Sequence, residues 1–168
     1  MYNRINNNTG ECMSKKDLYR PNVAMIVVSN NYPAKKEIFL AQRNDLGDVW
    51  QFPQGGIDKG EEVKEALFRE LEEEIGTNDV EIICEYPEWI SYDFPSKIAK
   101  NMKPYIGQKQ KYFLVKLNKN AKINIKTKHP EFSDYKFVST EDVLALSANF
   151  KKDVYTSVIN YFNNEGLL

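Results

Sequence analysis

The sequence of 168 residues contains one histidine and two cysteines, and this scarcity excludes several kinds of site. A zinc site with several histidine ligands is excluded, and a catalytic triad would depend on His129 alone, which we interpret as a bystander. Cys12 and Cys84 allow at most one bridge, so we expect two free thiols in a reducing compartment rather than a disulfide scaffold. Any catalysis is therefore expected to use carboxylates.

Long apolar segments are also missing. The run of residues 23–28 is far shorter than the roughly 20 residues that span a bilayer. Residues 1–17 are polar and rich in asparagine, without an export signal, so we expect a cytoplasmic protein with no membrane partner. We expect residues 1–17 to form a flexible tail, within which Met13 offers an alternative start, and residues 18–168 to form one domain.

Apolar periodicity and turn residues indicate the order of the main elements. They predict strands over 23–29, 37–42, 80–86, 111–117 and 135–138, and helices over 61–75, 140–146 and 152–162. We expect the first two strands to form a β-hairpin and Gly76 to end the first helix in the left-handed conformation. This mixture predicts an α/β fold, a sandwich in which helices cover a mixed sheet.

Charge is segregated along the chain, although the formal net charge is only −1. Residues 58–74 contain eight acids against three bases, whereas residues 94–130 contain ten lysines and no acid. A solvated lysine-rich surface is one interpretation of the second block. The other is metal-assisted chemistry on a polyanion, for which phosphates are the obvious candidate.

Some acids of the predicted helix fall on its apolar face. At about 100° per residue, Glu70 and Glu74 lie inside the apolar arc and Glu73 lies at its edge. By the same geometry, the acids on the solvated far face are Glu61, Glu65 and Glu72. Inward acids near a helix C-terminus repel one another and the helix dipole, so we interpret them as ligands of a divalent cation. Neutralisation by Arg69 is the alternative, but it would compensate one charge of three.

The acidic helix belongs to a longer pattern of fixed spacing. From Gly55 the chain follows G-x5-E-x7-R-E-L-x-E-E-x-G, which resembles the Nudix box of the Nudix hydrolases, with Thr77 in place of the final aliphatic residue. This resemblance implies an α/β/α sandwich that hydrolyses a nucleoside diphosphate linked to another moiety with Mg²⁺ or Mn²⁺. Segments outside the box resemble the RNA pyrophosphohydrolase subfamily, also described as dinucleoside polyphosphate hydrolases: 19–23, 50–56, 107–113, 130–132 and 150–155.

The resemblance also implies roles for individual residues. Two or more Mg²⁺ or Mn²⁺ ions would be held by Glu70, Glu73, Glu74 and Glu131, with the backbone brought close at Gly55. The catalytic residues would be Glu74, Glu131, Glu73 and Arg69, and either Glu74 or Glu131 is our choice for the base that takes the proton. Arg43 and Phe150 would stack on an RNA base. The remaining substrate contacts would come from Arg20, Gln54, Lys109, Lys111 and Lys151.

We therefore predict an RNA 5′-pyrophosphohydrolase that removes pyrophosphate from a 5′-triphosphorylated end, leaves a monophosphate and so promotes transcript decay. A dinucleoside polyphosphate of the diadenosine tetraphosphate type is the alternative substrate. A non-catalytic module that binds nucleotides or RNA ends is the second alternative. The sequence leaves the oligomeric state and a protein activator open.

Overall fold

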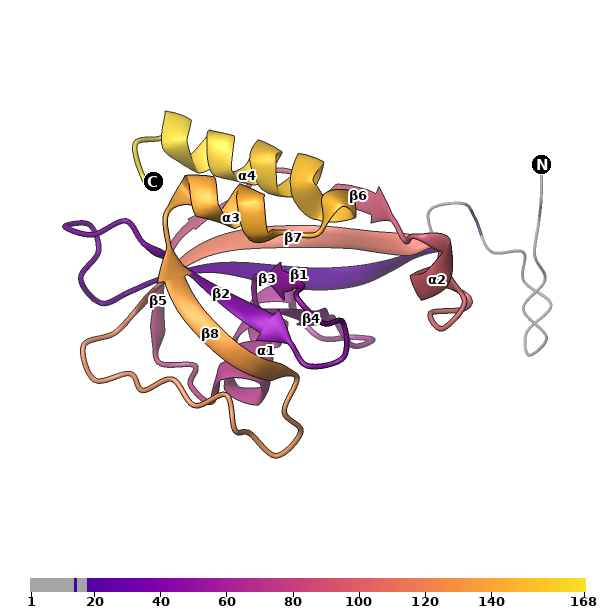
Figure 1. Cartoon of the computed structure of the whole chain (residues 1–168), viewed down its shortest axis with the longest axis horizontal. Helices are drawn as coiled ribbons and strands as arrows, with labels where there is room; N and C mark the ends of the chain where they lie inside the picture. Colours follow the sequence, from indigo (N-terminus) through magenta and orange to yellow (C-terminus); the bar gives the residue numbers. More distant parts are fainter. Residues whose placement is uncertain (1–13, 15–17) are drawn as a thin grey trace.

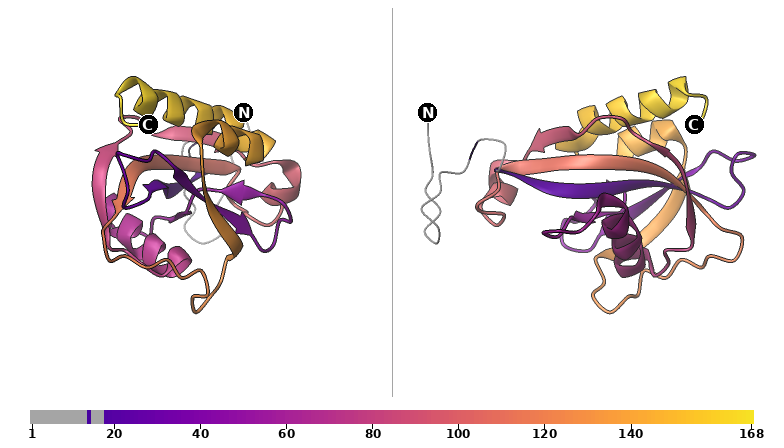
Figure 2. Two further views of the ribbon diagram at one scale, coloured as in Figure 1. Left: turned by 60° about the vertical axis from the view of Figure 1, so that its left-hand side comes forward. Right: turned by 180° about the vertical axis from the view of Figure 1, so that it is seen from behind.

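The computed structural model describes residue 14 and residues 18–168. An eight-stranded mixed sheet lies at the centre, with α1 (Val63–Ile75) on one face and α3 (Thr140–Leu146) and α4 (Lys152–Asn164) on the other (Figure 1). One apolar cluster fills each interface between sheet and helices. Figure 2 shows the helices on the two faces of the sheet in two further views. The predicted α/β/α sandwich is confirmed. The expected tail, with Cys12 and Met13, lies outside the described residues except for Ser14.

The first two strands diverge at the middle of the sheet, and the gap between them positions the candidate site described below. β1 (Tyr19–Val28) is parallel to β7 (Gly107–Leu117) along its whole length, but it pairs with β2 (Ile38–Arg43) only at Val28 and Ile38. The chain after β2 fills the space between the two diverging strands with two short strands. β3 (Trp50–Gln51) pairs with β2, and β4 (Gln54–Gly56) pairs with β1. The predicted hairpin therefore exists only at its turn, because the wedge of β3 and β4 separates the rest.

The outer strands complete the sheet. β5 (Val80–Glu85) and β6 (Ile90–Asp93) both pair with β7, and β8 (Phe132–Val138) pairs with β2. The short helix α2 (Ser96–Ala99), the 3₁₀ turn η2 (Asn149–Lys151) and β6 were not predicted. β1 and β7 begin before their predicted starts because their first halves bury polar side chains, which break the apolar pattern: Asn22, Gln108 and Gln110.

Local sequence explains both ends of α1. At its start, the Glu65 carboxylate accepts a hydrogen bond of 3.1 Å from the Glu62 backbone N–H. At its end, Gly76 adopts the predicted left-handed conformation with φ 71° and donates its N–H to the Glu72 carbonyl. The helix begins at Val63, later than predicted. Among the described residues, no helix has the length and apolar character needed to span a membrane.

Candidate active site

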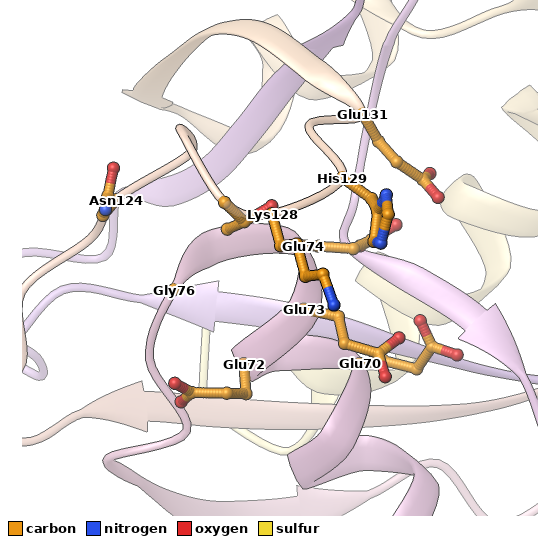
Figure 3. Close-up of a pocket in the computed structure, with 10 residues that line it drawn as sticks. Glu70, Glu72, Glu73, Glu74, Gly76, Asn124, Lys128, His129 and Glu131 are labelled. Carbon is orange, nitrogen blue, oxygen red and sulfur yellow. The ribbon is translucent and has the colours of Figure 1, made fainter.

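A pocket of about 640 Å³ lies where the C-terminal half of α1 meets the segment before β8 (Figure 3). Five carboxylates line it, and the four residues predicted as metal ligands are among them: Glu70, Glu72, Glu73, Glu74 and Glu131. The rest of the lining comes from Gly76, Asn124, Thr127, Lys128 and His129. The tertiary structure thus brings the distal Glu131 to the acids of the helix.

The acids of the pocket differ in burial. Glu70 and Glu74 point inward as the helical period predicts, with 9% and 3% of their surface exposed, whereas the Glu73 side chain is 59% exposed. Burial raises the pKa of both inward carboxyls, and the nearby Glu131 carboxylate raises the pKa of Glu74 further. These carboxylates therefore stand in an environment that disfavours their charge.

The donor set fits a hard divalent cation, because carboxylate oxygens are the ligands that Mg²⁺ and Mn²⁺ prefer. A cation between the acids would also relieve the repulsion that raises the pKa of Glu74. In the described part of the chain, no three His, Cys, Asp or Glu side chains already stand close enough to hold a metal. The pocket thus offers the ligands without a preformed cage.

The wedge strand β4 holds the inward acids in place. The Gln54 backbone N–H donates to the Glu74 carboxylate at 2.8 Å. A Cβ atom at Gly55 would lie 1.7 Å from the Glu70 carboxyl carbon, so only glycine lets this carboxylate pack against the strand. Gly56 gives similar room to the Arg20 guanidinium, which would lie 2.3 Å from an added Cβ atom.

Arg69 joins the helix to the wedge. Its guanidinium donates to both carboxylate oxygens of Glu61 at 2.7 and 2.8 Å, to the Gly56 carbonyl at 2.9 Å and to Glu70 at 2.7 Å. The hydrogen bonds from Arg69 lower the pKa of Glu61 to about 2. The prediction that Glu61 is a solvated helical acid was therefore wrong: it precedes α1, and its side chain is only 13% exposed.

Glu72 is exposed, as the helical period predicts, although it also borders the pocket. In Figure 3 its carboxylate nevertheless points away from those of Glu70 and Glu73. His129, interpreted from the sequence as a bystander, lies in the same lining. No sequence signal marks it, because its position depends on how the preceding segment crosses the end of α1.

A buried lysine lies on the other face of β4. The Lys151 side chain donates to the amide oxygens of Gln51 and Gln54, both at 2.9 Å, and only 4% of its surface is exposed. Burial lowers its pKa to about 7. The amide nitrogen of Gln51 is buried without a partner among the described residues, so a donor remains available there. Gln54 thus contacts Lys151 through its side chain and Glu74 through its backbone.

Further polar side chains of β6 and β7 extend the hydrogen-bonded group formed by Lys151, Gln51 and Gln54. Gln110 donates to Asn22 at 2.7 Å and to Gln54 at 3.1 Å, while the Tyr92 hydroxyl donates to Gln108 at 2.6 Å. Sequence reasoning missed this layer. The available signal was the alternation of glutamine and lysine along residues 108–111, in which the glutamines share one face of the strand.

The other predicted substrate residues have varied surroundings. The Arg43 guanidinium donates to both carboxylate oxygens of Asp45, at 2.6 and 2.7 Å, and lies 4.0 Å from the Glu131 carboxylate. The half-buried Phe150 ring lies 5.8 Å from the Tyr92 ring, measured between centroids.

The two lysines of β7 that were predicted to contact the substrate both have other partners within the protein. Lys109 is exposed, and its ammonium lies 5.1 Å from the centroid of the Trp89 ring. Lys111 is buried, bonds to Glu85 at 2.9 Å and to the Pro87 carbonyl at 2.8 Å, and is absent from the pocket lining. The structure therefore gives Lys111 a structural ion pair where the sequence predicted a phosphate contact.

Comparison with known proteins agrees with this geometry. The family model of the NUDIX domain matches residues 18–158. An RNA pyrophosphohydrolase of Campylobacter jejuni strain 81-176 is 62% identical over 93% of this chain and its own full length. The RNA pyrophosphohydrolase of Helicobacter pylori strain P12 is 52% identical over 89% of this chain and 97% of its own length.

Solved structures show the same fold at low sequence identity. The E. coli dihydroneopterin triphosphate pyrophosphohydrolase has a TM-score of 0.68 at 20% identity, covering 85% of this chain and 99% of its own. A C. elegans Ap4A hydrolase has a TM-score of 0.61 at 19% identity, covering 85% of this chain and 98% of its own. With its matching family model, its close relatives and its box acids in one pocket, the chain belongs to the NUDIX domain family.

Proposed function

We propose that this chain is an RNA 5′-pyrophosphohydrolase, which cleaves pyrophosphate from a 5′-triphosphorylated transcript and leaves a 5′-monophosphate that promotes decay. The observation that carries the proposal is the pocket of box carboxylates in a chain 62% identical to an RNA pyrophosphohydrolase over that relative's full length. The cytoplasm, where transcripts are made in a bacterium, is the proposed location.

Nudix hydrolases generally use divalent metal ions, and the proposed ions here are Mg²⁺ or Mn²⁺, two or more of them. Glu70, Glu73, Glu74 and Glu131 would hold them, with Gly55 leaving space for the backbone to approach. When bound, such ions polarise phosphate oxygens and lower the pKa of water. Glu74 or Glu131 would take the proton from the attacking water.

Arg69 has a positioning role in this proposal. Its five acceptor atoms come from the segment before α1, from β4 and from α1 itself, so one guanidinium fixes the helix acids relative to the wedge. A substrate contact by Arg69 is not needed, because its donors already have partners.

The nucleotide end of the substrate is proposed to lie on the other face of β4. Lys151, Gln54 and Arg20 would contact phosphates near the first nucleoside, and Arg43 and Phe150 would stack on a base. Eight of the ten lysines in residues 94–130 are exposed, and this charge would attract the following RNA backbone. Lys109 belongs to that exposed set and Lys111 does not.

The test compares kcat/KM for 5′-triphosphorylated RNA and for diadenosine tetraphosphate, with Mg²⁺ and with excess EDTA. Release of pyrophosphate and of 5′-monophosphorylated RNA, a higher kcat/KM for RNA and loss of activity in EDTA are expected. A higher kcat/KM for diadenosine tetraphosphate would replace the proposed substrate with the dinucleotide. Binding without hydrolysis of either compound would indicate the non-catalytic module.

A further inference from the structure

The segment that crosses the end of α1, residues 124–131, is fixed at both of its ends. At one end, the Asn124 backbone N–H donates to the Ile75 carbonyl at 2.8 Å, and the Asn124 carbonyl oxygen would lie 2.5 Å from a Cβ atom at Gly76. At the other end, Asn44 donates its backbone N–H to the Glu131 carbonyl at 3.0 Å and its side chain to the residue 130 carbonyl at 2.7 Å. We call this segment the strap.

The strap presents two nitrogen-bearing side chains to the pocket. Lys128 and His129 both line it together with the carboxylates of α1 and Glu131. In Figure 3 the Lys128 side chain reaches from the strap toward the side of α1 that carries Glu70 and Glu73. Within the described residues, no ion pair shorter than 4.0 Å joins Lys128 to any acid. Its ammonium group is therefore available to a ligand.

The charges of the pocket indicate which ligand that is. Among the described residues, Lys128 is the one lysine or arginine in a lining with five carboxylates. A pocket that held only divalent cations would gain nothing from a lysine, because the ammonium repels them. A phosphate group between the cation and the strap would bind to the cation and to the Lys128 ammonium at once, since lysine binds phosphate as a point charge.

The orientation of the substrate follows from Gln54. Its backbone binds Glu74 on the α1 side of the sheet, and its side chain binds Lys151 on the α4 side. Under the proposed function, the nucleoside lies on the Lys151 side, so the phosphates farthest from it reach the strap. We propose that Lys128, assisted by an imidazole N–H of His129, binds the free terminal phosphate that leaves within pyrophosphate. This inference rests on the proposed function.

A free terminal phosphate carries more negative charge than a phosphate esterified on both sides. Lys128→Gln should therefore lower kcat/KM for 5′-triphosphorylated RNA by roughly ten- to a hundredfold, the effect of losing one charged hydrogen bond. For diadenosine tetraphosphate, whose phosphates are all internal, the loss should be no more than about threefold. Lys35→Gln is the matched control, because Lys35 is exposed and lies outside both the pocket lining and the lysine block of residues 94–130.

A second measurement does not depend on turnover. Calorimetric titration of the Mg²⁺-loaded protein with inorganic pyrophosphate should show affinity weakened by about tenfold in Lys128→Gln, unchanged in Lys35→Gln and partly restored in Lys128→Arg. Thermal melting confirms that each variant is folded. Wild-type protein that fails to hydrolyse triphosphorylated RNA overturns the proposed function and the inference with it. If wild type is active but Lys128→Gln matches it, or loses equally on both substrates, only the inference is overturned.

Discussion

Replacing Lys151 by methionine should change how stability depends on pH. The Lys151 side chain is almost fully buried, and burial lowers its pKa to about 7 from the ordinary value of 10.5. Between these two values the unfolded chain binds more protons than the folded one, so the free energy of unfolding rises with pH. The penalty for burying the lysine is full below pH 7, shrinks by about 2 kcal/mol between pH 7 and pH 9, and vanishes above 10.5.

The assay is urea denaturation of metal-free protein at pH 7, 8 and 9. Methionine keeps most of the side-chain volume but has no ammonium, so the difference between wild type and Lys151→Met should change by about 2 kcal/mol in favour of wild type over this range. Other titrating groups cancel in this difference to first order. Lys152→Met, at a neighbouring lysine that is only partly buried, should follow wild type. Parallel pH curves for wild type and Lys151→Met would refute the reasoning.

Four further substitutions test the acidic side of the site. Glu74→Gln should reduce kcat on the order of a hundredfold, whereas Glu72→Gln, whose carboxylate points away from the other helix acids, should lose little; steady-state kinetics with Mg²⁺ separates the two. Gly55→Ala should displace the flexible Glu70 carboxylate and lower kcat at least tenfold, with a melting temperature close to wild type. Arg69→Lys should lower both the melting temperature and kcat, because an ammonium replaces the forked contacts of the guanidinium; a variant equal to wild type in both would contradict the positioning role.

The sequence by itself determined the local elements and the family pattern of the site. Helical periodicity predicted α1 and the inward direction of Glu70 and Glu74, because neighbouring residues alone set the direction of a helical side chain. Gly76 predicted the end of the helix for the same local reason. The box spacing predicted the ligand set, and the distal Glu131 came from the resemblance, not from any local pattern.

Only the tertiary structure decided which distant groups meet. Three contacts join residues whose pairing cannot be predicted from helical or strand periodicity. They are the paired hydrogen bonds between Arg69 and Glu61, the burial of Lys151 between Gln51 and Gln54, and the ion pair between Lys111 and Glu85. The wedge of β3 and β4 depends on how two strands of the sheet diverge. The strap lies over the acids because its two ends are bonded to α1 and to Asn44, which are far apart in sequence. Long-range packing fixes such contacts, and the sequence carries no spacing rule for them.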